Sequence, residues 1–104
     1  MKEFRIRLSE AAIGDILEQA DWYEEQADRE LSKRWERAVS SALIRIAKNP
    51  RSGTLCKFKV EELGRVRWVP VAGFPKYLVF YQFHENELDV LRVIHRARDL
   101  ETLI

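Results

Sequence analysis

Apolar and charged positions alternate at the start of the chain. The order is Phe4, Arg5, Ile6, Arg7 and Leu8. This period of two is typical of a half-buried strand. Ser9 follows directly, and its hydroxyl can accept a hydrogen bond from the free amides of a first helical turn. The pattern therefore predicts a short strand that leads into a helix.

Two longer segments repeat apolar residues at helical spacing and predict helices over about residues 10–26 and 29–48. The second helix ends at Asn49-Pro50, because the residue before a proline is pushed out of the helical region. The joint near Ala27-Asp28 contains no glycine or proline, so the pattern leaves its exact position open. Two helices with a short joint predict an antiparallel hairpin, with an acidic first arm and a basic second arm.

The residues after Pro50 change from helical to strand-like patterns. The sequence predicts a short or irregular strand at 55–60, a turn at 61–64, and strands at 65–71, 77–83 and 88–94. Pro70 favours a sheet edge or a strand end, because proline cannot donate to a ladder. We therefore predict an α+β fold, in which an N-terminal strand, a helical hairpin and an antiparallel three-strand meander form a four-stranded sheet with both helices on one face.

Length and composition indicate one globular domain over residues 1–104. Hydrophobic residues make up 46% of the 104 positions, which is enough for one compact core. A single cysteine, Cys56, excludes an internal disulfide and is typical of a reducing compartment. The chain shows neither an apolar run of signal-peptide length nor a membrane span. We expect a cytoplasmic protein that does not interact with membranes.

The net charge of +1 is unevenly distributed along the chain. Residues 1–30 hold nine acids and four bases, residues 31–60 hold one acid and eight bases, and residues 61–104 hold seven acids and six bases. General nucleic-acid binders usually carry a large basic excess, because phosphate neutralisation supplies much of their affinity. The near-neutral chain is therefore not expected to bind nucleic acid strongly by itself.

The candidate chemistry lies in the last third of the chain. Imidazole titrates near neutrality and guanidinium groups stabilise phosphates, so a nuclease would use His95 with arginines. The arginine candidates are Arg65, Arg67, Arg92, Arg96 and Arg98. Strand alternation places Arg92 and His95 on opposite faces, which favours a structural or interface role for His95. Cys56 has no second cysteine or spaced histidine, and no glycine-rich nucleotide loop is present, so no metal or cofactor is predicted.

Several segments resemble the ParE branch of the RelE/ParE toxin superfamily. They are Asp21-Trp22-Tyr23, Arg34-Trp35 through Asn49-Pro50, residues 69–81, and the closing segment Leu91-Arg92-Val93-Ile94-His95-Arg96-Ala97-Arg98-Asp99-Leu100. The resemblance implies a toxin of a type II toxin–antitoxin pair, neutralised by a cognate antitoxin whose C-terminal segment wraps the toxin surface. ParE toxins act on DNA gyrase, whereas RelE toxins cleave messenger RNA in the ribosome. RelE-type nucleases are strongly basic and end in a tyrosine or histidine.

This chain is near neutral and ends without a tyrosine, which favours the gyrase inhibitor, a protein that binds its target without enzymatic chemistry. The alternatives are a ribosome-dependent endonuclease that uses His95, Arg67 and Arg92, and an interaction module without toxicity. For the leading hypothesis, the expected target-binding residues are Arg65, Arg67, Arg92, His95, Arg96 and Arg98. Trp22 and Trp35 are expected to bind the antitoxin. They suggest an exposed apolar surface, and large apolar patches are usually covered by a partner.

Overall fold

The computed structural model of the chain describes residues 4–58 and 64–103. Within them the elements are β1 (Arg5–Leu8), α1 (Glu10–Gln26), α2 (Arg29–Lys48), the 3-10 turn η1 (Pro50–Ser52), β2 (Thr54–Leu55), β3 (Arg67–Val71), β4 (Phe74–His84), β5 (Glu87–His95) and α3 (Leu100–Leu103). The predicted turn at 61–64 lies mostly outside the described residues, as does the end of the predicted strand at 55–60.

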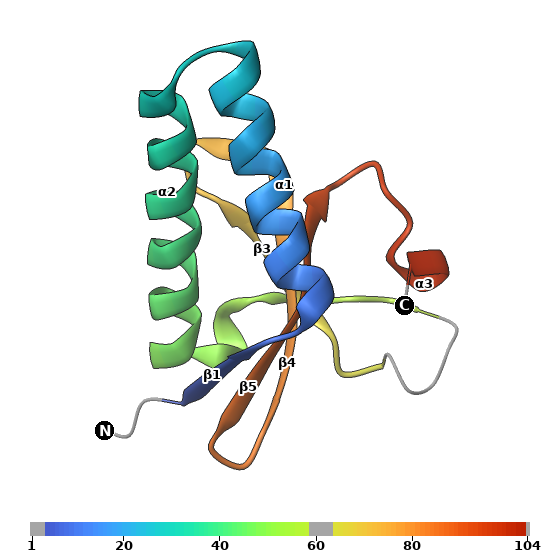
Figure 1. Cartoon of the computed structure of the whole chain (residues 1–104). Helices are drawn as coiled ribbons and strands as arrows, with labels where there is room; N and C mark the ends of the chain where they lie inside the picture. Colours follow the sequence, from blue (N-terminus) through green and yellow to red (C-terminus); the bar gives the residue numbers. More distant parts are fainter. Residues whose placement is uncertain (1–3, 59–63, 104) are drawn as a thin grey trace.

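The strands form one mixed sheet in the order β1-β5-β4-β3-β2. β1 pairs parallel to β5, whereas every other neighbouring pair is antiparallel. α1 and α2 lie side by side across one face (Figure 1). The α+β class and the helices on one face are confirmed. The sheet has one strand more than the four predicted, because Thr54–Leu55 pairs with Arg67 and Trp68. Pro70 lies near the end of β3, beyond the residues that pair with β2, which agrees with the prediction of a sheet edge or a strand end.

Side-chain caps define where both long helices begin. The Ser9 hydroxyl accepts from the Ala12 amide at 3.0 Å and donates to the Leu91 carbonyl at 2.7 Å, so it also ties α1 to β5. Asp28 caps α2 by accepting from the Leu31 amide at 2.8 Å. This acidic cap supplies the break between the helices where glycine and proline are missing.

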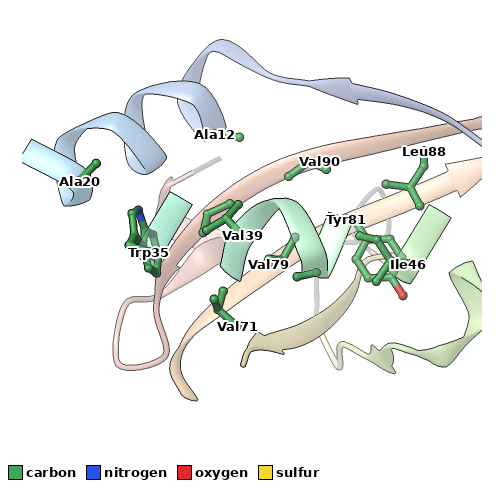
Figure 2. Packing of buried hydrophobic residues seen from close by; sticks show 12 residues of the cluster. Ala12, Ala20, Trp35, Val39, Ile46, Val71, Val79, Tyr81, Leu88 and Val90 are labelled. Carbon is green, nitrogen blue, oxygen red and sulfur yellow. The ribbon is translucent and has the colours of Figure 1, made fainter. Parts of the chain in front are cut away.

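The main core lies between the helices and the sheet (Figure 2). The helices contribute Ala12, Ala20, Trp35, Val39, Ala42 and Ile46, and the strands contribute Val71, Val79, Tyr81, Leu88, Val90 and Val93. Tyr81 is fully buried, and its hydroxyl donates to the Pro50 carbonyl at 2.7 Å and accepts from the Gly53 amide at 3.0 Å. This hydroxyl fixes the turn that follows α2, where a Cβ on Gly53 would collide with the Tyr81 ring.

A second apolar cluster covers part of the opposite face of the sheet. It contains Val66, Leu78, Phe80, Ile94 and Leu100. The short helix α3 supplies Leu100, so the C-terminal segment folds back onto the face that the long helices leave open. The two long helices therefore cover one face of the sheet, and the C-terminal segment covers part of the other.

A bulge in β5 adjusts which side chains reach each face. Tyr81 pairs with Val90 and Phe80 pairs with Arg92, so Leu91 is an extra residue in β5. Without this extra residue, strict alternation would send Arg92 toward the helices along with Val90. With it, Val93 joins the main core, and Arg92 lies opposite the open-face residue Phe80.

Candidate functional site

The open face of the sheet carries a groove with a volume of about 560 Å³. Its lining residues are Cys56, Lys57, Phe58, Trp68, Pro70, Pro75, Leu78, Phe80, Arg96, Arg98, Asp99 and Leu100. Apolar side chains from β3, β4 and α3 dominate this lining. Three cations, Lys57, Arg96 and Arg98, are exposed around it. An apolar floor with cations beside it suits a protein segment that carries apolar and acidic side chains.

Two backbone hydrogen bonds place the two arginines beside the groove. The Arg96 amide donates to the Lys76 carbonyl at 2.6 Å, and the Arg98 amide donates to the His95 carbonyl at 2.9 Å. Asp99 then caps α3, because its carboxylate accepts from the Glu101 amide at 3.1 Å. Asp99 therefore fixes the start of α3 directly beside the two arginines.

Cys56 lines this groove, and burial raises the pKa of its thiol to about 11. Only the thiolate reacts with alkylating agents. We therefore expect Cys56 to react with iodoacetamide at pH 8 at least about tenfold more slowly than a free cysteine of pKa about 8.5. The rate should rise steeply as the pH approaches 11. Mass spectrometry of the alkylated chain between pH 7 and 10 measures this, and a rate at pH 8 equal to that of a model thiol would contradict it.

His95 lies at the other side of this end of the sheet, next to α1. Its ring meets the Tyr77 ring edge-on at 5.3 Å between centroids, and its Nδ1 accepts from the Ala97 amide at 3.0 Å. A smaller cleft of about 180 Å³ contains His95, Tyr77 and Trp22. Because Nδ1 accepts this hydrogen bond, Nε2 is the nitrogen that carries the hydrogen in the neutral ring. His95 is thus held by two local contacts, in keeping with the structural role that alternation favoured.

Arg92 is the predicted site residue whose environment differs most from the expectation. Its guanidinium forms a bidentate pair with Asp15 of α1, with both N–O distances at 2.7 Å. The two side chains are 15% and 12% exposed. The hydrogen bonds to Asp15 raise the pKa of Arg92 above its ordinary value, against the opposing effect of desolvation. Asp15 also accepts from the Val93 amide at 3.0 Å, and a further Arg92 nitrogen reaches the Leu103 carbonyl at 3.4 Å. Arg92 therefore joins α1, β5 and α3, and its guanidinium is not free to bind a target.

Arg65 and Arg67 lie at a different place again. Arg67 donates to the Gly53 carbonyl at 2.8 Å and to the Arg51 carbonyl at 3.3 Å. Together with Arg51 and Phe83, these arginines line a separate hollow. The structure therefore spreads the six predicted target-binding residues over four environments: the groove, the small cleft, the Asp15 ion pair and this hollow. The groove and the small cleft are neighbours, because Arg98 lines both of them. The predicted nuclease set of His95, Arg67 and Arg92 is not brought together.

The two tryptophans expected to bind an antitoxin differ sharply in exposure. Trp22 is 53% exposed and stacks edge-on against Tyr23. Trp35 is fully buried, and its indole donates to the Ile16 carbonyl at 3.0 Å. The prediction that Trp35 contacts an antitoxin is wrong for this conformation, because the side chain has no accessible surface. Trp22 retains the accessible area that such a contact requires.

Sequence reasoning missed the apolar floor of the groove and the acidic partner of Arg92. The floor had a signal, since Leu78 and Phe80 alternate with the core residues Val79 and Tyr81. Asp15 had none, because its partner is 77 residues away. In residues 4–58 and 64–103, no group of three or more potential metal-ligating side chains of His, Cys, Asp or Glu lies together. No helix in this part of the chain is both long and apolar enough for a membrane span.

Comparisons with known proteins agree with the fold and identify the family of the chain. The model of the family described as the ParE toxin of the type II toxin–antitoxin system parDE matches residues 6–100. A chain from a solved structure of the chromosomal ParDE TA system of P. aeruginosa is similar in fold, with a TM-score of 0.73 and 13% sequence identity. The similarity covers 89% of this chain and 96% of that one. The search of curated proteins gives no match. Because the family model covers nearly the whole sequence, this chain belongs to the ParE toxin family of type II toxin–antitoxin systems.

Proposed function

We propose that this chain is a growth-inhibiting toxin that binds DNA gyrase through a protein–protein contact and is neutralised by a cognate antitoxin. The observation that carries the proposal is the open-face groove with Arg96 and Arg98 beside it. Its floor is apolar, and no histidine is among the described residues that line it. Binding of a protein segment requires only this combination of apolar surface and charge.

The distribution of the arginines and His95 supports inhibition by binding over RNA cleavage. A nuclease needs an acid–base group and cations that converge on one phosphate. Here Arg92 is engaged by Asp15, and Arg67 is engaged by backbone carbonyls. His95 lies in the small cleft, which of the candidate arginines only Arg98 also lines. The near-neutral charge points the same way, because it lacks the general attraction for RNA that such nucleases use.

The antitoxin is proposed to contact Trp22. This side chain is the most exposed of the aromatic residues on α1, and it adjoins the small cleft that contains Tyr77 and His95. Exposed tryptophans are frequent binding hot spots, because they bury a large area at a small cost in side-chain entropy. An antitoxin segment over Trp22 would also cover His95.

Charge reversal beside the groove tests the target. We expect the purified chain to inhibit gyrase supercoiling and to leave transcripts intact in a translation-coupled cleavage assay. The double variant Arg96→Glu/Arg98→Glu should weaken gyrase inhibition by at least about tenfold, since two like-charge contacts replace two favourable ones. Arg65→Glu is the control for the single variants Arg96→Glu and Arg98→Glu, because it reverses one equal charge in a separate hollow.

Two outcomes would overturn this function. Cleaved transcripts with unimpaired gyrase would identify a ribosome-dependent endonuclease. Absence of both effects, together with normal growth when the chain is expressed without an antitoxin, would identify an interaction module without toxicity. Equal losses in the single variants Arg65→Glu, Arg96→Glu and Arg98→Glu would move the target-binding surface away from the groove.

A further inference from the structure

The outer face of the helical hairpin carries two charged stripes that the toxin function leaves unexplained. On α1, the residues Glu10, Gly14, Glu18, Asp21 and Glu25 recur every three or four positions, and all are exposed. On α2, the residues Arg34, Arg37, Ser41, Arg45 and Lys48 recur in the same way and are also exposed. Such spacing places each set along one line of its helix. We refer to these sets as the acidic stripe and the basic stripe.

The antiparallel hairpin brings the two stripes into register. Both helices rise about 1.5 Å per residue from the joint at Ala27-Asp28, so residues equally distant from it lie at about the same height. Gly14 is then level with Ser41, near the middle of both stripes. Glu18 is level with Arg37, and Asp21 is level with Arg34. Figure 1 shows the two helices side by side along their length.

The charges on the two stripes do not neutralise each other within the chain. The ion pairs on this hairpin are Arg29–Glu24, at the joint, and Arg37–Glu30, within α2. No ion pair within 4 Å joins the acidic stripe to the basic stripe in the part of the chain described. Arg37 is thus engaged by Glu30 of its own helix. Among the described residues, the other charged members of the two stripes form no ion pair within 4 Å and face solvent or a partner.

Exposed apolar side chains lie beside the charges. Ile13 and Leu17 of α1 are 42% and 52% exposed, and Ile44 of α2 is 53% exposed. Gly14 has nothing within 4 Å of where a Cβ would lie, so the backbone of α1 is directly accessible there. A small residue in the middle of each stripe allows another helix to approach closely. The face thus combines accessible apolar area with separated charges.

We propose that a second copy of this chain binds to this face, with the acidic stripe of each protomer against the basic stripe of its partner. A two-fold axis parallel to the helices produces this arrangement. It keeps every residue at its own height and places α1 over the partner's α2, so Glu18 faces the partner's Arg37 and Asp21 faces the partner's Arg34. The four helices then pack as an antiparallel bundle with an isologous interface.

Charge selects this axis over its alternative. The alternative two-fold axis lies in the plane of the interface, perpendicular to the helices. It would place α1 over the partner's α1 and α2 over the partner's α2. Acids would then face acids and bases would face bases, which is repulsive at both contacts. Only the axis parallel to the helices makes both contacts attractive. The same surface is therefore complementary to itself in one orientation.

The oligomeric state of the purified chain tests the proposal first. Sedimentation at about 100 µM chain and low salt should give twice the 12.3 kDa of one chain. Raising the salt from about 50 to 500 mM should weaken the dimer by about tenfold, because surface charges are screened. A mass of 12.3 kDa at low salt and high concentration would overturn the proposal and leave this face for a different partner.

Charge reversal and mixing then locate the interface. The acidic-stripe variant Glu18→Lys/Asp21→Lys and the basic-stripe variant Arg34→Glu/Arg37→Glu should each be monomeric alone. Their equimolar mixture should recover the doubled mass, because each altered stripe then meets a stripe of opposite charge in the other variant. Circular dichroism checks that each variant is folded, and Leu17→Gln provides a test without charge reversal that should also weaken the dimer.

Controls separate this interface from the toxin activity. Glu85→Lys and Arg65→Glu each reverse one charge of the same kind away from the hairpin and should leave the mass unchanged. A dimer formed by the acidic-stripe variant alone or by the basic-stripe variant alone would overturn the proposed geometry. So would the absence of a dimer when the two folded stripe variants are mixed. Gyrase inhibition plays no part in these measurements, so the two proposals can fail separately.

Discussion

Replacing Arg92 by methionine is expected to lower the free energy of unfolding by about 3 kcal/mol, because it leaves Asp15 as a nearly buried carboxylate without its cation. Methionine keeps an unbranched side chain that can pack where the arginine stem lies. The loss therefore reports the ion pair more than the packing. Urea denaturation followed by circular dichroism measures it.

Removing the second charge should recover most of this loss. Asp15→Asn alone also leaves one uncompensated charge, although its amide oxygen can still accept from the Val93 amide. In the double variant Asp15→Asn/Arg92→Met, neither charge remains. We expect the double variant to be more stable than either single variant, since the penalty of a buried pair falls on the partner left alone.

An exposed ion pair serves as the matched control. Arg7 and Glu87 pair at 2.8 Å, but their side chains are 63% and 32% exposed. Arg7→Met removes the same kind of contact in water and should leave the midpoint of unfolding in place. If Arg92→Met is as mild as Arg7→Met, the Asp15 pair does not hold α1, β5 and α3 together.

This ion pair also affects how an Arg92 variant is judged in a toxicity assay. Arg92 lies in the segment that resembles the family, so its replacement could be mistaken for loss of a target contact. The structure attributes the effect to folding instead, because both the guanidinium and its partner are mostly buried. Toxicity should therefore be compared at equal amounts of folded protein.

Local sequence patterns were sufficient to predict the helices. The predicted bounds of 10–26 and 29–48 are confirmed as Glu10–Gln26 and Arg29–Lys48. Periodicity and the Asn49-Pro50 stop act between neighbours in the chain, so a single sequence reveals them. The cap at Asp28 also has a local signal, because an acidic residue stands three positions before Leu31.

The sheet depended on contacts that no local pattern reveals. The parallel pairing of β1 with β5 joins residues about 80 positions apart, for example Arg5 with Glu87. β2 has only two residues, too few to show a period. The bulge at Leu91 is visible only from the register between two strands. These features are set by how the complete core packs.

The candidate site shows the same division between local and distant information. Alternation placed Arg92 and His95 on opposite faces, and this is confirmed by their partners Phe80 and Tyr77, which pack in different clusters. The engagement of Arg92 by Asp15 could not be predicted, because it depends on where α1 crosses β5. Trp35 occupies the apolar stripe of its helix, so its burial had a signal that the expected antitoxin contact overlooked.

Variants of Trp35 and Trp22 should have separate effects, the first on stability and the second on partner binding. Trp35→Ala is expected to lower the free energy of unfolding by about 3–5 kcal/mol, because it opens a cavity in the main core. The indole is fully buried, hydrogen-bonds the Ile16 carbonyl, and packs edge-on against Phe74 and Tyr77. Trp35→Phe should be milder, since it keeps an aromatic ring and loses mainly the hydrogen bond.

Trp22→Ala is the matched variant at the exposed position and should change the free energy of unfolding by no more than about 0.5 kcal/mol. If the antitoxin covers Trp22, the same variant should weaken antitoxin binding by at least about fivefold, as removal of an interface aromatic does. Thermal unfolding and calorimetric titration with the cognate antitoxin measure the two effects on one preparation. Unchanged antitoxin affinity in a folded Trp22→Ala chain would place the antitoxin elsewhere, whereas a stable Trp35→Ala chain would contradict the central position of Trp35 in the core.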